Sequence, residues 1–118
     1  MLVEDEFLIR LTLSEVLGDE GYTVIEAESG DEALIMLRAN PSVDVLLTDV
    51  QLPGVLDGYA LVAQARQTMP ALPVIFMTGR PDRLAGRPKS PIELHLAKPY
   101  RPSDVCNAIQ SLLKQAKA

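Results

Sequence analysis

Residues 43–48 form a nearly continuous apolar run that ends at Asp49. A strand that is apolar on both of its faces is typical of a parallel sheet with helices on both sides. Residues 73–77 repeat the pattern, so a second buried strand is predicted there. Parallel neighbours need a crossover connection, which is usually a helix. The sequence therefore predicts an α/β fold built around a buried parallel sheet.

Strand and helix patterns alternate along the rest of the chain. Further strands are predicted at 1–3, 23–25 and 94–97. A helix between the first two of these is indicated by apolar residues at helical spacing, namely Leu8, Leu11, Val16 and Leu17. Five predicted strands thus alternate with four or five helices.

Local signals mark where the other helices begin. Ser29 and Glu32 have the spacing of a capping box, so a helix should begin there. Asp57 can cap the next helix, and Pro102 suits the first turn of the last one. Residues 79–93 contain three prolines and two glycines, which predicts that a fourth helix in this stretch is short.

The composition fits one ordinary globular domain, which we expect to span residues 1–118. Cys106 is the single cysteine, so no disulfide can form within the chain, and a reducing cytoplasmic location is expected. No apolar run approaches the roughly 20 residues that a membrane-spanning helix needs, so no membrane contact is expected. A net charge of -5 argues against nucleic acid as a partner.

The charges are distributed unevenly along the chain. Residues 1–61 hold 13 of the 16 acidic residues and two bases, Arg10 and Arg38, whereas residues 62–118 hold the other nine bases. An acidic site built by the first half would attract a cation, with bases from the second half nearby.

Polar side chains stand at the carboxyl ends of the predicted strands. Glu4 and Asp5 follow the first strand, Asp49 ends the third, Thr78 ends the fourth, and Lys98 follows the fifth. These ends meet at one edge of a parallel sheet, where ligands of such folds bind. Crowded carboxylates need a cation, and carboxylate oxygens with a phosphate are typical of Mg²⁺. A carboxylate can also act as a nucleophile toward phosphorus, so the pattern indicates phosphoryl chemistry.

Four short motifs, at 3–6, 48–54, 77–79 and 97–100, resemble those of the receiver domain of two-component response regulators. The resemblance covers essentially the whole chain. It implies a flavodoxin-like, doubly wound sheet of five parallel strands in the order 2-1-3-4-5, with helices on both faces.

The resemblance implies roles for the acidic residues. Asp49 would be the phosphoacceptor. Mg²⁺ would be held by Glu4, Asp5 and Asp49, directly or through water, together with the main-chain carbonyl of Gln51. The cofactor that we expect is therefore Mg²⁺.

The resemblance also implies roles for residues near the last two strands. Lys98 would contact the phosphoryl group, and Thr78 would turn toward it after transfer. The Lys98–Pro99 peptide bond would be cis, which proline makes tolerable. His95 stands three residues before the lysine, where the family usually has Tyr or Phe at the switch position. A histidine there could still move inward with Thr78, and its charge could respond to pH.

Gln51 and Arg80 each lie two residues beyond a predicted site residue, where they flank the path of water to the phosphorus atom. We hypothesise that they tune the rate of hydrolysis without affecting metal binding. The loop at 54–57 has one residue more than the common pattern of the family, so the resemblance does not predict its shape.

These expectations favour a phosphorylation-controlled switch that is not an enzyme. A histidine kinase or phosphotransfer protein would donate the phosphoryl group, and a downstream protein target would receive the signal, with homodimer formation left open. The alternative is a receiver-like interaction module that signals without phosphate. A phosphatase with an aspartyl nucleophile is less favoured, because Gln51 cannot supply a proton, and the chain has no glycine-rich loop for a dinucleotide.

Overall fold

Five parallel strands form one sheet in the computed structural model of the chain, which describes residues 1–40, 42–79 and 90–116. In order across the sheet, they are β2 (Glu26–Ala27), β1 (Leu2–Val3), β3 (Leu46–Asp49), β4 (Val74–Thr78) and β5 (Glu93–Ala97). All neighbouring pairs run parallel. The predicted order 2-1-3-4-5 is therefore confirmed.

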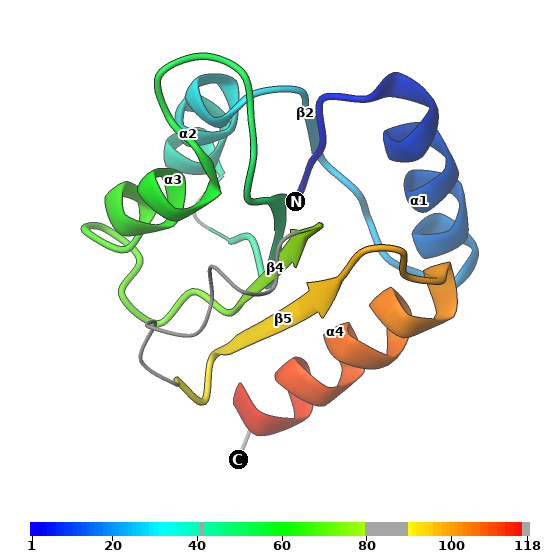
Figure 1. Cartoon of the computed structure of the whole chain (residues 1–118). Coiled ribbons are helices and arrows are strands. Elements are labelled where there is room, and N and C mark those ends of the chain that lie inside the picture. Colours follow the sequence, from blue (N-terminus) through cyan, green and yellow to red (C-terminus); the bar gives the residue numbers. More distant parts are fainter. Residues whose placement is uncertain (41, 80–89, 117–118) are drawn as a thin grey trace.

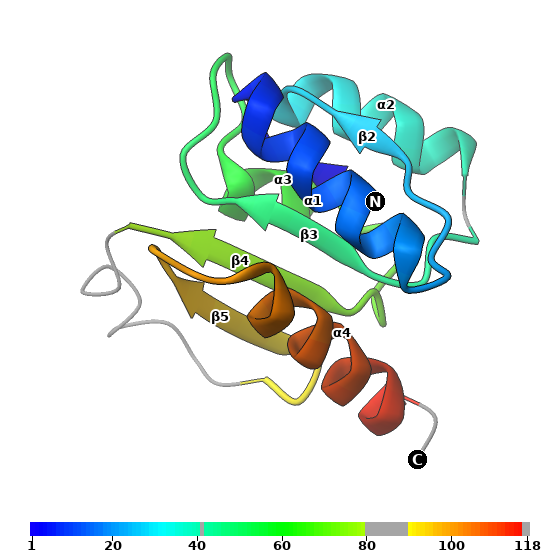
Figure 2. The ribbon, with the colours of Figure 1, turned by 90° about the vertical axis from the view of Figure 1, so that its right-hand side faces the viewer.

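Helices cover both faces of the sheet. Within the described residues they are α1 (Phe7–Asp19), α2 (Gly30–Ala39), α3 (Gly58–Ala65) and α4 (Pro102–Ala116). Figure 1 shows α2 and α3 on one side of the sheet and α1 and α4 on the other. Figure 2 looks onto the side that α1 and α4 cover. The short helix predicted within 79–93 falls mostly on residues that the structure does not describe.

The alternation of side chains along the strands divides the core into two layers. Leu46, Val74 and Phe76 are buried in the layer that contacts α2 and α3. Leu47 and Ile75, which lie between them in sequence, are buried in the layer that contacts α1 and α4. Because both faces are covered, the strands need apolar residues at nearly every position, which explains the continuous runs in the sequence.

The position predicted for the second strand is wrong. The strand is Glu26–Ala27 and not 23–25. Its place is set by β1, because Leu2 and Val3 pair with Glu26 and Ala27, and the Leu2 N–H donates to the carbonyl of the preceding Ile25. β-branched residues favour an extended chain, but a ladder forms only where a neighbouring strand lies alongside.

The predicted apolar face of α1 is partly wrong. Leu17 is buried as expected, but Leu8 is 73% exposed and Leu11 is 39% exposed. Leu13, which was not part of the predicted face, is buried instead. Apolar residues lie on several sides of this helix, and Phe7 is 62% exposed as well. Spacing alone therefore could not identify the side that packs against the sheet.

The predicted helix starts are confirmed. The Ser29 side chain accepts a hydrogen bond from the Glu32 N–H at 3.1 Å, and Asp57 accepts one from the Ala60 N–H at 2.8 Å. Each bond satisfies an N–H that the helix itself leaves without a partner. The last helix begins at Pro102.

The loop between β3 and α3, whose shape the resemblance did not predict, is attached to α2. Gly54 takes the left-handed conformation with φ of 89°. The next residue, Val55, donates its N–H to Asp31 Oδ2 at 3.4 Å. Leu56 is buried against the start of α2, where a Cβ on Gly30 would lie 2.6 Å from the Leu56 carbonyl oxygen. Only glycine therefore allows this close approach between loop and helix.

Gly58 allows α3 to begin directly against β3. A Cβ at this position would lie 2.3 Å from the Asp49 carbonyl oxygen, at the end of the strand, and 2.9 Å from the Cα of Val50, the residue that follows it. Gly58→Ala is expected to lower the free energy of unfolding by about 2 kcal/mol, because the helix or the strand end must move. Urea denaturation measures the difference.

Gly18 in α1 supplies the matched control, since nothing lies within 4 Å of a Cβ placed there. Gly18→Ala should raise the free energy of unfolding by about 0.5–1 kcal/mol, because alanine favours the helix. Stabilisation by Gly58→Ala as well would contradict the close approach described above.

Candidate functional site

The register of the sheet places several polar side chains at one edge. Val3 pairs with Thr48, and Asp49 pairs with Met77, so β1, β3 and β4 end at nearly the same level. Figure 2 shows the arrowheads of β3, β4 and β5 pointing toward this edge. The polar residues at or directly after the strand ends are Glu4, Asp5, Asp49, Thr78 and Lys98.

Asp49 is buried at the end of β3 and is paired with a base. It is 5% exposed, and its Oδ2 accepts a hydrogen bond from Lys98 Nζ at 2.8 Å. The Lys98 N–H donates to the Thr78 carbonyl at 2.7 Å, which holds the lysine backbone beside β4. Burial of Lys98 acts against its charge, but the hydrogen bond to Asp49 and the negative charges of Asp49 and Glu4 raise its pKa. The lysine therefore carries a positive charge at neutral pH.

Glu4 is almost completely buried, with 1% of its surface exposed. Its Oε1 accepts the Glu6 N–H at 3.2 Å, whereas its buried Oε2 has no hydrogen-bond partner within the described residues. Burial, together with the neighbouring Asp49 carboxylate, raises the pKa of Glu4 to about 7. A buried carboxylate oxygen without a partner is costly, and a cation placed beside it would remove that cost.

The three acids fit a divalent cation. One carboxylate oxygen from each of Glu4, Asp5 and Asp49 can be chosen such that all lie within 4.8 Å of one another. All are hard oxygen ligands, which suit Mg²⁺ better than zinc. The Glu4 oxygen without a partner belongs to this donor set, and a cation there would satisfy it.

The acids border a cavity of about 470 Å³ at the carboxyl edge of the sheet. The residues lining it that matter for the predicted chemistry are Asp5, Asp49, Gln51, Thr78 and Lys98. Thr78 is buried and Gln51 is exposed. The structure therefore brings together most of the predicted site residues, with Glu4 buried beside them. Arg80 lies outside the described part of the chain.

His95 does not line this cavity. Its ring stacks on the ring of Phe76, with the centroids 5.2 Å apart and an angle of 14° between the planes. The Phe76 ring also contacts the ring of Tyr59 in α3, with the centroids 4.8 Å apart. The three rings form a row from β5 through β4 to α3, which we call the aromatic row. His95 is thus part of the packing between β5, β4 and α3.

Two residues next to the site had no assigned role in the sequence analysis. Tyr100, the first of them, follows the Lys98–Pro99 peptide bond, whose predicted cis form is confirmed. Its buried hydroxyl has no partner within the described residues. Burial and the negative charges of Glu4 and Asp49 raise the pKa of Tyr100 to about 12. Tyr100 therefore stays neutral near the acids.

Arg10 is the second such residue. Its Nη1 donates to the main-chain carbonyl of Glu4 at 2.7 Å, and its Nε donates to Glu26 Oε1 at 3.2 Å. A signal for it was present in the sequence, because Arg10 is one of only two bases among residues 1–61. A lone base in a segment rich in acids is expected to form an ion pair with one of them, as Arg10 does with Glu26.

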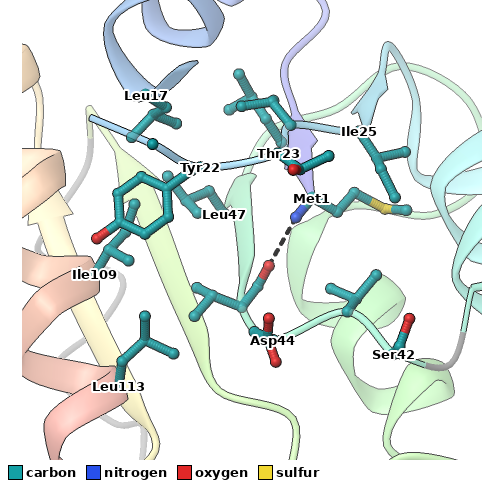
Figure 3. A pocket seen from close by; sticks show the side chains of 15 residues that line it. Met1, Leu17, Tyr22, Thr23, Ile25, Ser42, Asp44, Leu47, Ile109 and Leu113 are labelled. Atoms are coloured by element: carbon teal, nitrogen blue, oxygen red, sulfur yellow. Dashed lines mark hydrogen bonds between the residues drawn. The ribbon is translucent and has the colours of Figure 1, made fainter. Parts of the chain in front are cut away.

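A different cavity, of about 420 Å³, lies at the amino ends of the strands. Apolar side chains such as Leu47, Ile109 and Leu113 surround it (Figure 3). The Met1 amino group donates to the Val45 carbonyl there at 2.8 Å. Burial lowers the pKa of this amino group to about 6, against a smaller opposing effect of the Asp44 charge. This cavity lacks the set of acids with a paired lysine, so the carboxyl edge is the better candidate site.

Comparisons with known proteins identify the family. A model of the response regulator receiver domain matches residues 1–110. Transcriptional regulatory protein CreB of Escherichia coli is 39% identical over 119 residues, which cover 98% of this chain and 51% of CreB. Sensor kinase CckA of Brucella abortus is 34% identical over 118 residues, which cover 98% of this chain and 12% of CckA.

Solved structures agree with this result. A crystal structure of a response regulator receiver protein from Sinorhizobium medicae matches with a TM-score of 0.88 at 26% identity, covering 98% of this chain and 93% of that one. The chain belongs to the receiver domain family of two-component response regulators. It spans about half the length of CreB. No helix within the described residues is long and apolar enough to cross a membrane.

The raised pKa of Glu4 predicts how stability depends on pH without divalent cations. The group titrates near 4.5 when unfolded and near 7 when folded. Between these values the folded state binds more protons, so stability should fall as pH rises from about 4.5 to about 7. Glu4→Gln should remove this part of the slope and stabilise the metal-free protein at pH 7.5 by on the order of 1–2 kcal/mol. Thermal unfolding in a chelator at pH 5 and pH 7.5 measures both effects.

The buried Met1 amino group acts in the opposite direction between pH 6 and 8, because its pKa is lowered from 8.0 to about 6. The Met1 amino group is present in both the parent chain and Glu4→Gln, so the difference between their pH slopes isolates the contribution of Glu4. The control is Glu6→Gln, which changes an exposed neighbouring acid and should keep the parent slope. If stability depended on pH with the same slope in the parent and in Glu4→Gln, the pKa of Glu4 would not be raised in the folded state.

Proposed function

We propose that this chain is the phosphoacceptor receiver domain of a two-component phosphorelay and accepts a phosphoryl group on Asp49. The donor is a phosphohistidine of a histidine kinase or phosphotransfer protein. A carboxylate oxygen of Asp49 forms the new P–O bond as the P–N bond breaks, and the ring nitrogen keeps the electron pair. The product is an acyl phosphate. The main support is the 2.8 Å contact between Lys98 and Asp49 beside the buried Glu4 oxygen without a partner.

The side chains around Asp49 have complementary roles in this proposal. Lys98 transfers its contact from Asp49 to a phosphoryl oxygen, so the new charge meets an existing cation. Glu4, Asp5 and Asp49, with the main-chain carbonyl of Gln51, would hold Mg²⁺. When bound, Mg²⁺ supplies positive charge that lowers the repulsion between the incoming phosphoryl oxygens and the carboxylates.

The signal leaves the site through Thr78 and His95. Thr78 lines the cavity, so its hydroxyl can turn toward the phosphoryl group and donate a hydrogen bond. His95 occupies the switch position, and its shift would alter the aromatic row and the surface of β4 and β5. This change biases an equilibrium between two conformations that a downstream protein target distinguishes. The reaction changes the chain itself, so the domain is an acceptor and not an enzyme.

A groove beside the site is the proposed docking surface of the phosphodonor protein. The groove has a volume of about 640 Å³ between α1 and the segment after β5. Lys98 borders both this groove and the cavity at Asp49. Phe7 and Leu8 are exposed on the same helix, and exposed apolar patches of this kind mark interaction sites. A protein seated here could bring its phosphohistidine to Asp49.

Incubation with acetyl phosphate and Mg²⁺, followed by intact mass measurement, tests the acceptor role of Asp49. The parent chain should gain the mass of one phosphoryl group, and Asp49→Asn should lose nearly all of this gain. Asp44→Asn is the matched control, because it changes an exposed aspartate at the other end of the strands. Labelling of Asp49→Asn equal to the parent would disprove the proposal.

The same assay separates the alternatives. A receiver-like module that signals without phosphate would show no mass gain, whereas an aspartyl phosphatase would release phosphate repeatedly from an external phosphomonoester.

Following the decay of the acyl phosphate tests the tuning role proposed for Gln51 and Arg80. Substitution of both with no change in decay would remove that role.

Leu8→Asp should slow transfer from a phosphorylated histidine phosphotransfer protein by about tenfold, because it places a charge in the apolar groove. The rate with acetyl phosphate should not change, since the small donor needs no docking surface. Stopped time points analysed by intact mass give both rates.

Ile35→Asp is the matched control for this substitution, because Ile35 is 69% exposed on α2, across the sheet from the groove. It should leave both rates unchanged. An equal loss in Ile35→Asp, or an equal loss with both donors in Leu8→Asp, would rule out the groove as the docking surface.

A further inference from the structure

The turn between β1 and α1 is held by an arginine that belongs to neither the acids nor the phosphoryl contacts. Arg10 donates from Nη1 to the carbonyl oxygen of Glu4 at 2.7 Å. This carbonyl is part of the peptide bond between Glu4 and Asp5, so the hydrogen bond fixes the peptide plane from which Asp5 departs. The Asp5 side chain is exposed and makes no hydrogen bond to the described residues. Its direction therefore depends on that plane.

Arg10 is itself held in one orientation. The side chain is 12% exposed, and its Nε donates to Glu26 Oε1 at 3.2 Å. The other oxygen of Glu26 accepts from Ser14 Oγ at 3.2 Å, and the guanidinium lies 5.6 Å from the centre of the Phe7 ring. A planar guanidinium can serve two acceptors in fixed directions, which an ammonium group cannot do in the same way. Arg10 thus connects β2 to the turn that carries the acids.

The charge of Arg10 would by itself oppose a cation at the acids. Two like charges near each other repel, and removal of one strengthens binding of the other. Glu26 lies within ion-pair distance and offsets this charge. The hydrogen bond to the turn is then available with little electrostatic cost to the site.

We propose that Arg10 is a positioning residue of the cation site, which acts through the Glu4 carbonyl to aim the Asp5 carboxylate at the cavity. This inference rests on the proposed function, because it concerns the binding of Mg²⁺ at the same acids. Glu4 itself has a second attachment, since its N–H donates to the Ala27 carbonyl at 3.1 Å. Loss of Arg10 therefore affects Asp5 more than the strand, and cation affinity more than folding.

Calorimetric titration of the chain with MgCl₂ tests the proposal. Arg10→Met should raise the Kd for Mg²⁺ by about tenfold, as expected when a residue that orients metal ligands is lost. Arg10→Lys keeps the charge but cannot reach both acceptors in the same geometry, so a rise of about threefold is expected. Urea unfolding in a chelator is the second readout and should change little in either variant.

Arg38→Met is the matched control, because Arg38 is the other base of the acidic segment and is exposed on α2. It should leave the Kd unchanged or slightly lowered. If Arg10 acted through its charge alone, Arg10→Met would also lower the Kd, so an unchanged or lower Kd overturns the proposal. Absence of Mg²⁺ binding in the parent chain would instead overturn the proposed function, on which this inference rests.

Discussion

The contact between Asp49 and Lys98 depends on the parallel arrangement of the sheet. The two residues are 49 positions apart and meet at 2.8 Å, because β3 and β5 run in the same direction on either side of β4. Every strand of such a sheet delivers its last residue to the same edge. The helices stabilise this arrangement by covering both faces, with α3, which connects β3 to β4, on one face and α4, which follows β5, on the other. The site is therefore a product of strand direction, and no single segment of the chain contains it.

Much of this arrangement could be predicted from the sequence. Asp49 and Thr78 end apolar runs that only a sheet covered on both faces explains, so their place at one edge followed from strand direction alone. The caps at Ser29 and Asp57 were also predictable, because each bond involves residues close in sequence.

Other features depend on partners that are distant in sequence. The ladder at Glu26–Ala27 is set by β1, so the extended residues before it could not reveal its position. The exposed side of α1 is decided by the sheet and α4, since apolar residues occur on several of its sides. Arg10 was missed because its role appears only when β2 brings Glu26 next to the turn. Local patterns predict local bonds, whereas long-range packing decides the rest.

The way in which the β3–α3 loop is attached determines where the loop can accept an additional residue. The loop is held closely at two points, by Leu56 against Gly30 and by Gly58 against the backbone of Asp49. Between Gly54 and Leu56 only Val55 extends outward, and it is 90% exposed. We therefore expect an extra residue at this point to extend into solvent without moving the aspartate. Position 55 is accordingly a suitable place to graft a short peptide or attach a fluorescent reporter.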